Sequence, residues 1–150
     1  MNTYSLQTKT LIKEKLPKAL LGGLIGTVVF TLMGQFMAPH IIGHPMDVAV
    51  MVAPLLGGSH TLGVVAHFVN GIVVYPIAYL LFGISKMPGA APLRGALFLI
   101  LIYLAAMLVF MPIIGQGLFL GSPPKAMVAL MGHIVFGLIM GGIIGKPSHG

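Results

Sequence analysis

The chain has 150 residues, of which 57% are hydrophobic and only 7% are charged, and its mean hydropathy is +1.05. These values exclude a soluble globular domain and indicate an integral membrane protein. The net charge of +6 comes from eight basic residues that flank apolar segments, so we expect no nucleic-acid partner. The lack of cysteine excludes disulfides, iron–sulfur clusters and thiolate metal sites.

Four apolar segments are long enough to cross a bilayer as helices, which takes about 20 residues each. They lie at about 18–38, 59–82, 93–114 and 124–145. Pro17, Pro92 and Pro123 stand at the expected helix starts, where a missing N–H costs little. The sequence therefore predicts an all-α membrane protein that forms one integral-membrane domain over residues 1–150. The segment before Pro17 is either a short interfacial helix or a solvated tail.

The connection between the first two spans contains Asp47, which precedes an apolar run too short to span. We expect a short interfacial or re-entrant helix near 47–57, with Asp47 as its N-cap or as an acidic site residue.

Seven of the eight basic residues lie before the first span, in the second connection or after the fourth span, and only Lys125 lies elsewhere. Under the positive-inside rule, both termini should face the cytoplasm.

Two sequence patterns occur twice in the same order. FMAPHIIG, which ends at Gly43, resembles FMPIIG, which ends at Gly115, and each is followed one helix later by H-[FI]-V-x-G, at His67 and at His133. These matches predict two tandem two-helix repeats, at about 18–82 and 93–145, related by a pseudo-two-fold axis along the membrane normal. His67 and His133 would then lie at one depth.

Each of these two histidines lies on a ridge of small residues spaced four apart, as expected of a helix face that packs closely on another helix. An intramembrane polar group must be satisfied by a partner. In one account, the imidazoles of His67 and His133 form polar contacts, with Asn70, Tyr75, Tyr79 and Thr31 as available partners. In a second account, the two imidazoles ligate a haem b.

A third account is a proton or metal pathway that opens outward. His60 lies one heptad before His67, and His40 and His44 are one helical turn apart, near Met37 and Met46. Histidine with methionine suits copper, so His40, His44, Met46 and His60 form a candidate copper set. With only Glu14 and Asp47 as acids, no paired-carboxylate site is available. A Ser-His-Asp arrangement would need Asp47 beside Ser59 and His60, and we expect no enzyme activity of the chain on its own.

The chain resembles an uncharacterised family of small bacterial four-helix membrane proteins. The resemblance rests on the length, the four spans, the Asp-led short helix, the histidine with glycine four residues later, and the closing segment GHIVFGLIMGGIIG. It implies a bacterial inner membrane and no known activity.

Because four short spans expose apolar ridges and carry no soluble domain, we expect an accessory subunit of a larger respiratory or redox complex, surrounded by lipid and by other membrane subunits or copies of itself. The alternatives are a small transporter or channel, or a haem- or copper-binding module.

Overall fold

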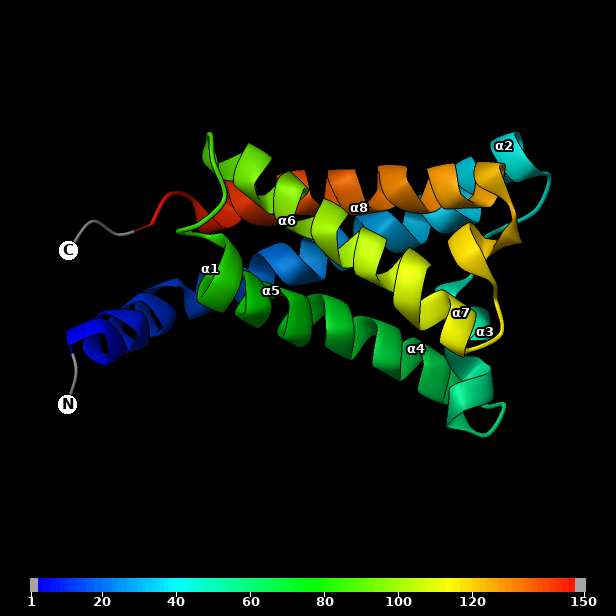
Figure 1. Cartoon of the computed structure of the whole chain (residues 1–150), viewed down its shortest axis with the longest axis horizontal. Coiled ribbons are helices and arrows are strands. Elements are labelled where there is room, and N and C mark those ends of the chain that lie inside the picture. Colours follow the sequence, from blue (N-terminus) through cyan, green and yellow to red (C-terminus); the bar gives the residue numbers. More distant parts are fainter. Residues whose placement is uncertain (1–2, 148–150) are drawn as a thin grey trace.

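The computed structural model describes residues 3–147, with side chains from residue 10 onward, and this part of the chain is helical with no strand (Figure 1). The four predicted apolar spans are confirmed, as helices over Thr10–Ile42, His60–Gly83, Ala91–Ile113 and Pro123–Ile144.

The first span consists of α1 (Thr3–Leu32), the π-helical turn η1 (Met33–Met37) and α2 (Ala38–Ile42). The second contains α4 (His60–Val69), η3 (Asn70–Val74), α5 (Tyr75–Ala78) and η4 (Tyr79–Gly83). The third contains α6 (Ala91–Ala105), η5 (Ala106–Phe110) and α7 (Met111–Ile113). After the 3-10 turn η6 (Leu118–Gly121), the fourth span is one regular helix, α8 (Pro123–Ile144).

The first helix begins earlier than the sequence analysis predicted. Pro17 lies inside α1 and not at its start, which corrects the assignment of Pro17 as a helix-opening residue. The preceding Lys13, Glu14 and Lys15 are good helix formers, so the helix continues through the proline. The hydrogen bond that Pro17 removes would use the carbonyl of Lys13, in a charged segment where water can replace it. Pro92 and Pro123 lie in the first turns of α6 and α8, as predicted.

Three of the π-helical turns follow from prolines inside the spans. In η1, Ala38 N–H bonds to Met33 O, five residues back, and the next donor in this pattern would be Pro39, which has no N–H. The same arrangement occurs in η3, which ends shortly before Pro76, and in η5, which ends shortly before Pro112. A proline ring clashes with the carbonyl four residues back, and widening the helix by one residue relieves the clash. Each proline therefore leaves one carbonyl free within the membrane.

The first connection uses one of these free carbonyls. Met46 N–H donates to Gly34 O at 2.9 Å, which ties the connection back onto the first span. Asp47 then caps α3 (Val48–Val52) by accepting a hydrogen bond from Ala49 N–H at 2.8 Å, and η2 (Ala53–Leu56) follows. The predicted short helix near 47–57 is thus present, and it packs against α4.

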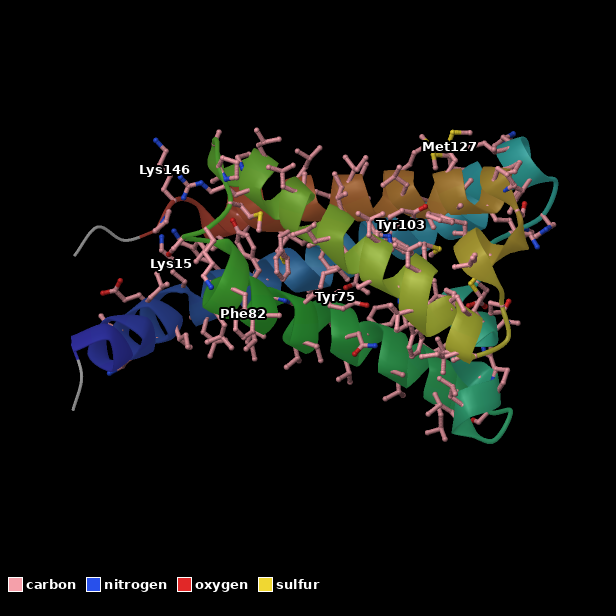
Figure 2. The ribbon with its side chains drawn as sticks, viewed as in Figure 1. Lys15, Tyr75, Phe82, Tyr103, Met127 and Lys146 are labelled. Atoms are coloured by element: carbon pink, nitrogen blue, oxygen red, sulfur yellow. The ribbon has the colours of Figure 1, made fainter. Side chains whose placement is uncertain are left out.

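Most of the described basic side chains lie at the end of the bundle where α1 begins and α8 ends, as Lys15 and Lys146 show in Figure 2, whereas Lys125 lies in the first turn of α8, at the other end. Lys15 Nζ donates to Ile144 O at 3.4 Å, which joins α1 to the last turn of α8. Arg94 donates to Ile84 O at 2.9 Å and Gly89 O at 2.8 Å, and so satisfies carbonyls of the second connection. The short elements α2, α3 and α7 lie at the opposite end (Figure 1).

The core forms where α8 packs against both α1 and α6. On the α6 side the two backbones touch, because a Cβ on Gly95 would overlap Gly137 O and a Cβ on Gly141 would overlap Ala91 O. One buried cluster around Tyr79, Leu99 and Met140 fills the end with the basic residues, and a second around Tyr103, Met107 and Val128 fills the other half.

Candidate functional site

A partly enclosed cavity of about 200 Å³ lies in the half of the bundle that contains α2, α3 and α7. Its walls come from the second span, from the end of the third, and from α8, and Phe30 of α1 forms its back. Residues of α3 and η2, including Met51, Val52 and Leu55, close its end with apolar side chains. His67 and His133, the two histidines that the sequence singles out, both line this cavity.

His133 has a defined tautomer. Its Nδ1 lies 2.7 Å from Ala129 O, one helical turn back on α8. A carbonyl oxygen only accepts, so Nδ1 carries the proton. In the neutral imidazole, Nε2 is then a bare lone pair, and among the described residues it has no hydrogen-bond partner.

His67 has the complementary arrangement. Its Nε2 lies 3.0 Å from Thr31 Oγ1, and the Thr31 hydroxyl donates to Thr27 O at 2.8 Å. With its one proton used, the hydroxyl accepts from His67 Nε2–H, which leaves Nδ1 of His67 as a bare lone pair. Thr31 is one of the four partners that the sequence offered for the histidines.

Phe30 lies against both imidazoles, with ring centroids 5.8 Å from His67 and 5.2 Å from His133. Gly132, just before His133, leaves room for this ring, because a Cβ there would meet Phe30 at 2.7 Å. The two histidines bond to separate partners: His67 contacts Thr31 of the first span, whereas His133 contacts Ala129 O of its own helix, so the polar-contact account of the pair stays a prediction. A haem between them would have to displace Phe30, and ligation of haem b stays a prediction.

Two further polar side chains line the cavity, Asn70 and Tyr75 of the second span. Asn70 is exposed in the middle of an apolar span, and the ring of Tyr75 lies 6.3 Å from that of Phe136 on α8. Neither side chain has a hydrogen-bond partner in the described part of the chain, although both were expected partners of the histidines. The fourth expected partner, Tyr79, is fully buried outside the cavity, and its hydroxyl is also unpartnered.

The structure separates the roles of the candidate copper residues. Met46 is buried in the core, whereas His40 and His44 are exposed, and His44 Nδ1 lies 2.9 Å from Pro45 O. His60 is engaged by Asp47. Over residues 3–147, no three His, Asp or Glu side chains come close enough to hold a metal ion. Copper binding by His40, His44, Met46 and His60 stays a prediction.

Asp47 has two structural roles at the closed end of the cavity. While Oδ1 caps α3, Oδ2 accepts from His60 Nε2 at 2.9 Å and so joins α3 to the first turn of α4. Partial burial opposes ionisation of Asp47, but the hydrogen bonds from His60 and from Ala49 N–H outweigh it and hold the pKa of this carboxyl below its usual value. Ser59 accepts from Leu62 N–H at 3.2 Å as the cap of α4, so its hydroxyl serves the helix start.

Sequence reasoning found both histidines but missed Phe30 and the covering role of α3. Phe30 is one of many apolar residues in α1, and nothing in the spacing marks it. A usable signal was Gly132 beside His133, since a glycine in a spanning helix often admits a neighbouring side chain or backbone.

These features define a multi-pass helical membrane protein with a mainly apolar cavity between its spans that contains a few polar side chains. Over residues 13–149 the sequence matches the model of a family described as "Family of unknown function (DUF6789)", and the chain belongs to this family. The expected resemblance to an uncharacterised family is therefore confirmed. No curated protein and no solved structure matches the chain.

Proposed function

We propose that this protein is an accessory subunit of a larger membrane redox assembly, and that it contributes a cavity that binds a small membrane-soluble molecule. The observation that carries the proposal is the set of unpartnered polar groups in the cavity: Asn70, Tyr75 and the free nitrogen of His133. Inside a bilayer, such groups lack the water that would satisfy them at a surface. A bound molecule with polar atoms supplies the missing hydrogen bonds.

The size and lining of the cavity support a small, mainly apolar occupant. An apolar cavity of about 150 Å³ holds one benzene molecule, so about 200 Å³ accommodates a substituted six-membered ring. Most lining residues are aliphatic, methionine or aromatic, which is typical of ligand sites with a few placed polar groups.

The test uses two neighbouring alanines of the third span. Ala106 lines the cavity, whereas Ala105 is exposed on the outer side of the helix. The full chain is extracted in mild detergent, and native mass spectrometry detects small molecules that it retains. We expect Ala106→Phe to lose the retained molecule by filling the cavity, and Ala105→Phe to keep it. Equal retention by both variants would contradict cavity binding.

The accessory role has a separate test. Isolated from its native membrane in mild detergent, the chain should migrate in an assembly that also contains subunits with redox cofactors. Migration only at multiples of the 15.7 kDa chain mass would contradict this part of the proposal.

We place the protein in a bacterial inner membrane with both termini cytoplasmic. This orientation is supported by the gathering of Lys15, Arg94 and Lys146 at the end of the bundle where α1 begins and α8 ends. The cavity then lies in the outer half of the bundle. Reporter fusions after Gly58 and after the C-terminus should give opposite signals, and a cytoplasmic signal at both would contradict the orientation.

We also propose that the two halves arose by duplication, with the second span corresponding to α8. Two local features support it. The segments FMAPHIIG and FMPIIG each begin at the end of a π-helical turn, and in both one residue separates that turn from a proline. In addition, a Cβ on Gly23 would crowd Gly71 O, and one on Gly95 would crowd Gly137 O, so the motif glycines pack alike. An experimental structure in which the two halves do not superpose by a rotation near two-fold would reject the duplication.

A further inference from the structure

The polar groups of the cavity lie on two different walls. His133 comes from α8, whereas His67, Asn70 and Tyr75 come from the second span. A ligand that satisfies both walls needs polar atoms at two separated positions. A molecule with one polar end, such as an alcohol or a fatty acid, would leave one wall unsatisfied.

The His133 wall requires a donor from the ligand. Because Nδ1–H of His133 is used by Ala129 O, the free Nε2 can only accept in the neutral imidazole. A hydroxyl group can donate to this nitrogen. A carbonyl oxygen in the same place would set two lone pairs against each other.

The second-span wall is more permissive. The side-chain amide of Asn70 and the hydroxyl of Tyr75 can each donate or accept, and the free Nδ1 of His67 accepts. This wall therefore satisfies a second hydroxyl in either hydrogen-bonding role.

The lining favours a planar ring between these walls. Phe30 contacts both imidazoles, and the rings of Tyr75 and Phe136 lie 6.3 Å apart, so aromatic side chains surround the polar groups. Aromatic rings pack well in offset or edge-to-face contacts with one another.

The exposed lining residues show where the cavity opens. Asn70 of the second span and Phe110 of the third are both exposed, as is Leu55 of η2, which together with α3 covers the far end. The opening between these two spans faces the lipid, so a ligand enters from the bilayer and an apolar tail can remain there.

Resting on the binding function proposed above, we propose that the cavity binds the head group of a quinol. One hydroxyl of the ring donates to Nε2 of His133, the second meets the polar groups of the second span, and the alkyl tail leaves between Asn70 and Phe110. The oxidised quinone binds more weakly, because it presents carbonyl oxygens to a nitrogen that only accepts.

The experiment is isothermal titration calorimetry on the full chain in nanodiscs under anaerobic conditions, with empty nanodiscs as the baseline. Three probes share a ten-carbon tail: a decyl-1,4-benzoquinol, the corresponding quinone, and decylbenzene. We expect saturable binding of one quinol per chain, quinone binding about tenfold weaker, and decylbenzene binding weaker still.

The variants locate the hydrogen bonds. His133→Phe should weaken quinol binding about tenfold and leave decylbenzene binding unchanged, whereas His40→Phe, at an exposed histidine outside the cavity, should change neither. If circular dichroism shows that His133→Phe does not fold, the binding test uses Tyr75→Phe instead, which removes only a hydroxyl. This variant should weaken quinol binding about threefold.

The outcomes separate this inference from the function on which it rests. Equal affinities for quinol and quinone, or unchanged quinol binding in His133→Phe and Tyr75→Phe, would overturn the quinol assignment. If decylbenzene then binds the wild type as tightly as the quinol does, a membrane-soluble ligand still occupies the cavity and the proposed function stands. If no probe binds and Ala106→Phe retains the same molecules as the wild type, the quinol assignment and the proposed cavity-binding function are both rejected.

Discussion

The second span and α8 carry the same pattern of a histidine with small residues spaced four apart, yet they pack differently. In α8, both Gly137 and Gly141 lie against the backbone of α6, and 50% of the residues in an 18-residue apolar stretch of this span are buried. In the corresponding stretch of the second span, only 22% of the residues are buried. The small residues of this span contact two different helices: Gly63 lies against Ala49 of α3, and Gly71 lies against Thr27 of α1.

This difference shows what a ridge of small residues specifies. Such a ridge marks a face that another backbone can approach, but it does not choose the partner. The whole α8 ridge can follow one neighbour because α8 is a regular helix. The second span contains a π-helical turn before Pro76, which shifts the faces of its two halves relative to each other. The cavity lies on the loosely packed side.

The largest effect should come from breaking the tight contact between α6 and α8. A side chain at Gly137 would overlap Gly95 O and the backbone of Ala96, which cannot move as a flexible side chain can. We expect Gly137→Val to lower the free energy of unfolding by about 3 kcal/mol, measured by denaturation in mixed micelles. Gly142→Val on the same helix is the control, because a Cβ there meets only Pro92 Cγ at 3.6 Å. Equal destabilisation by both would show that the α6–α8 contact is not close.

Removing the ring between the two histidines should have the next largest effect. Phe30 is 8% exposed, whereas Phe36 on the same span is 70% exposed. We expect Phe30→Ala to cost about 2 kcal/mol through lost packing and an enlarged cavity, and Phe36→Ala to cost little. Thermal melting of the two variants in one detergent measures the difference. A Phe30→Ala variant as stable as Phe36→Ala would contradict the placement of this ring.

The covering helix α3 should loosen in acid. Folding lowers the pKa of Asp47, so its ionised form stabilises the fold. This contribution is complete above the ordinary value of 3.8 and is lost as the pH falls through the lowered pKa. Hydrogen exchange of the α3 amides, measured by mass spectrometry, should therefore show less protection near pH 3 than near pH 6 after correction for intrinsic rates.

Two variants divide the roles of Asp47. Asp47→Ala should cost about 1 kcal/mol by removing the cap of α3. Asp47→Asn keeps a capping side chain but cannot titrate, so it should abolish the pH dependence and retain most of the protection. Unchanged pH dependence in Asp47→Asn would show that another group controls α3.

The smallest expected effect concerns the contact of His67 with Thr31. Thr31→Val removes the hydroxyl that accepts from His67 Nε2–H, and should cost about 0.6 kcal/mol, the mean for such contacts between spanning helices. Nitrogen-15 chemical shifts of the imidazole should show the Nε2–H tautomer in the wild type and lose this preference in the variant. Thr61→Val, at an exposed threonine of the second span, is the control. A wild-type Nδ1–H tautomer would reverse the proposed hydrogen-bond direction.

The sequence by itself determined the number of spans, their approximate limits, the short helix after Asp47 and the helix-opening roles of Pro92 and Pro123. These features depend on residues close together in the chain: a run of about 20 apolar residues suffices for a span, and a cap or a proline acts within one turn. The early start of α1 was not predicted, because Pro17 is an ambiguous signal when strong helix formers precede it.

Only the tertiary structure decided which neighbours the histidines have. His67 and His133 were recognisable as a pair, but the ring of Phe30 lies against both imidazoles because of how α1 packs against the second span and α8. In a soluble helix, the apolar stripe identifies the buried face. The spans of this protein are apolar on nearly every side, so hydrophobic periodicity cannot separate the faces that contact lipid, another helix or a cavity. Close contacts between residues distant in the sequence made that choice, at Gly95 with Gly137 and at Gly23 with Gly71.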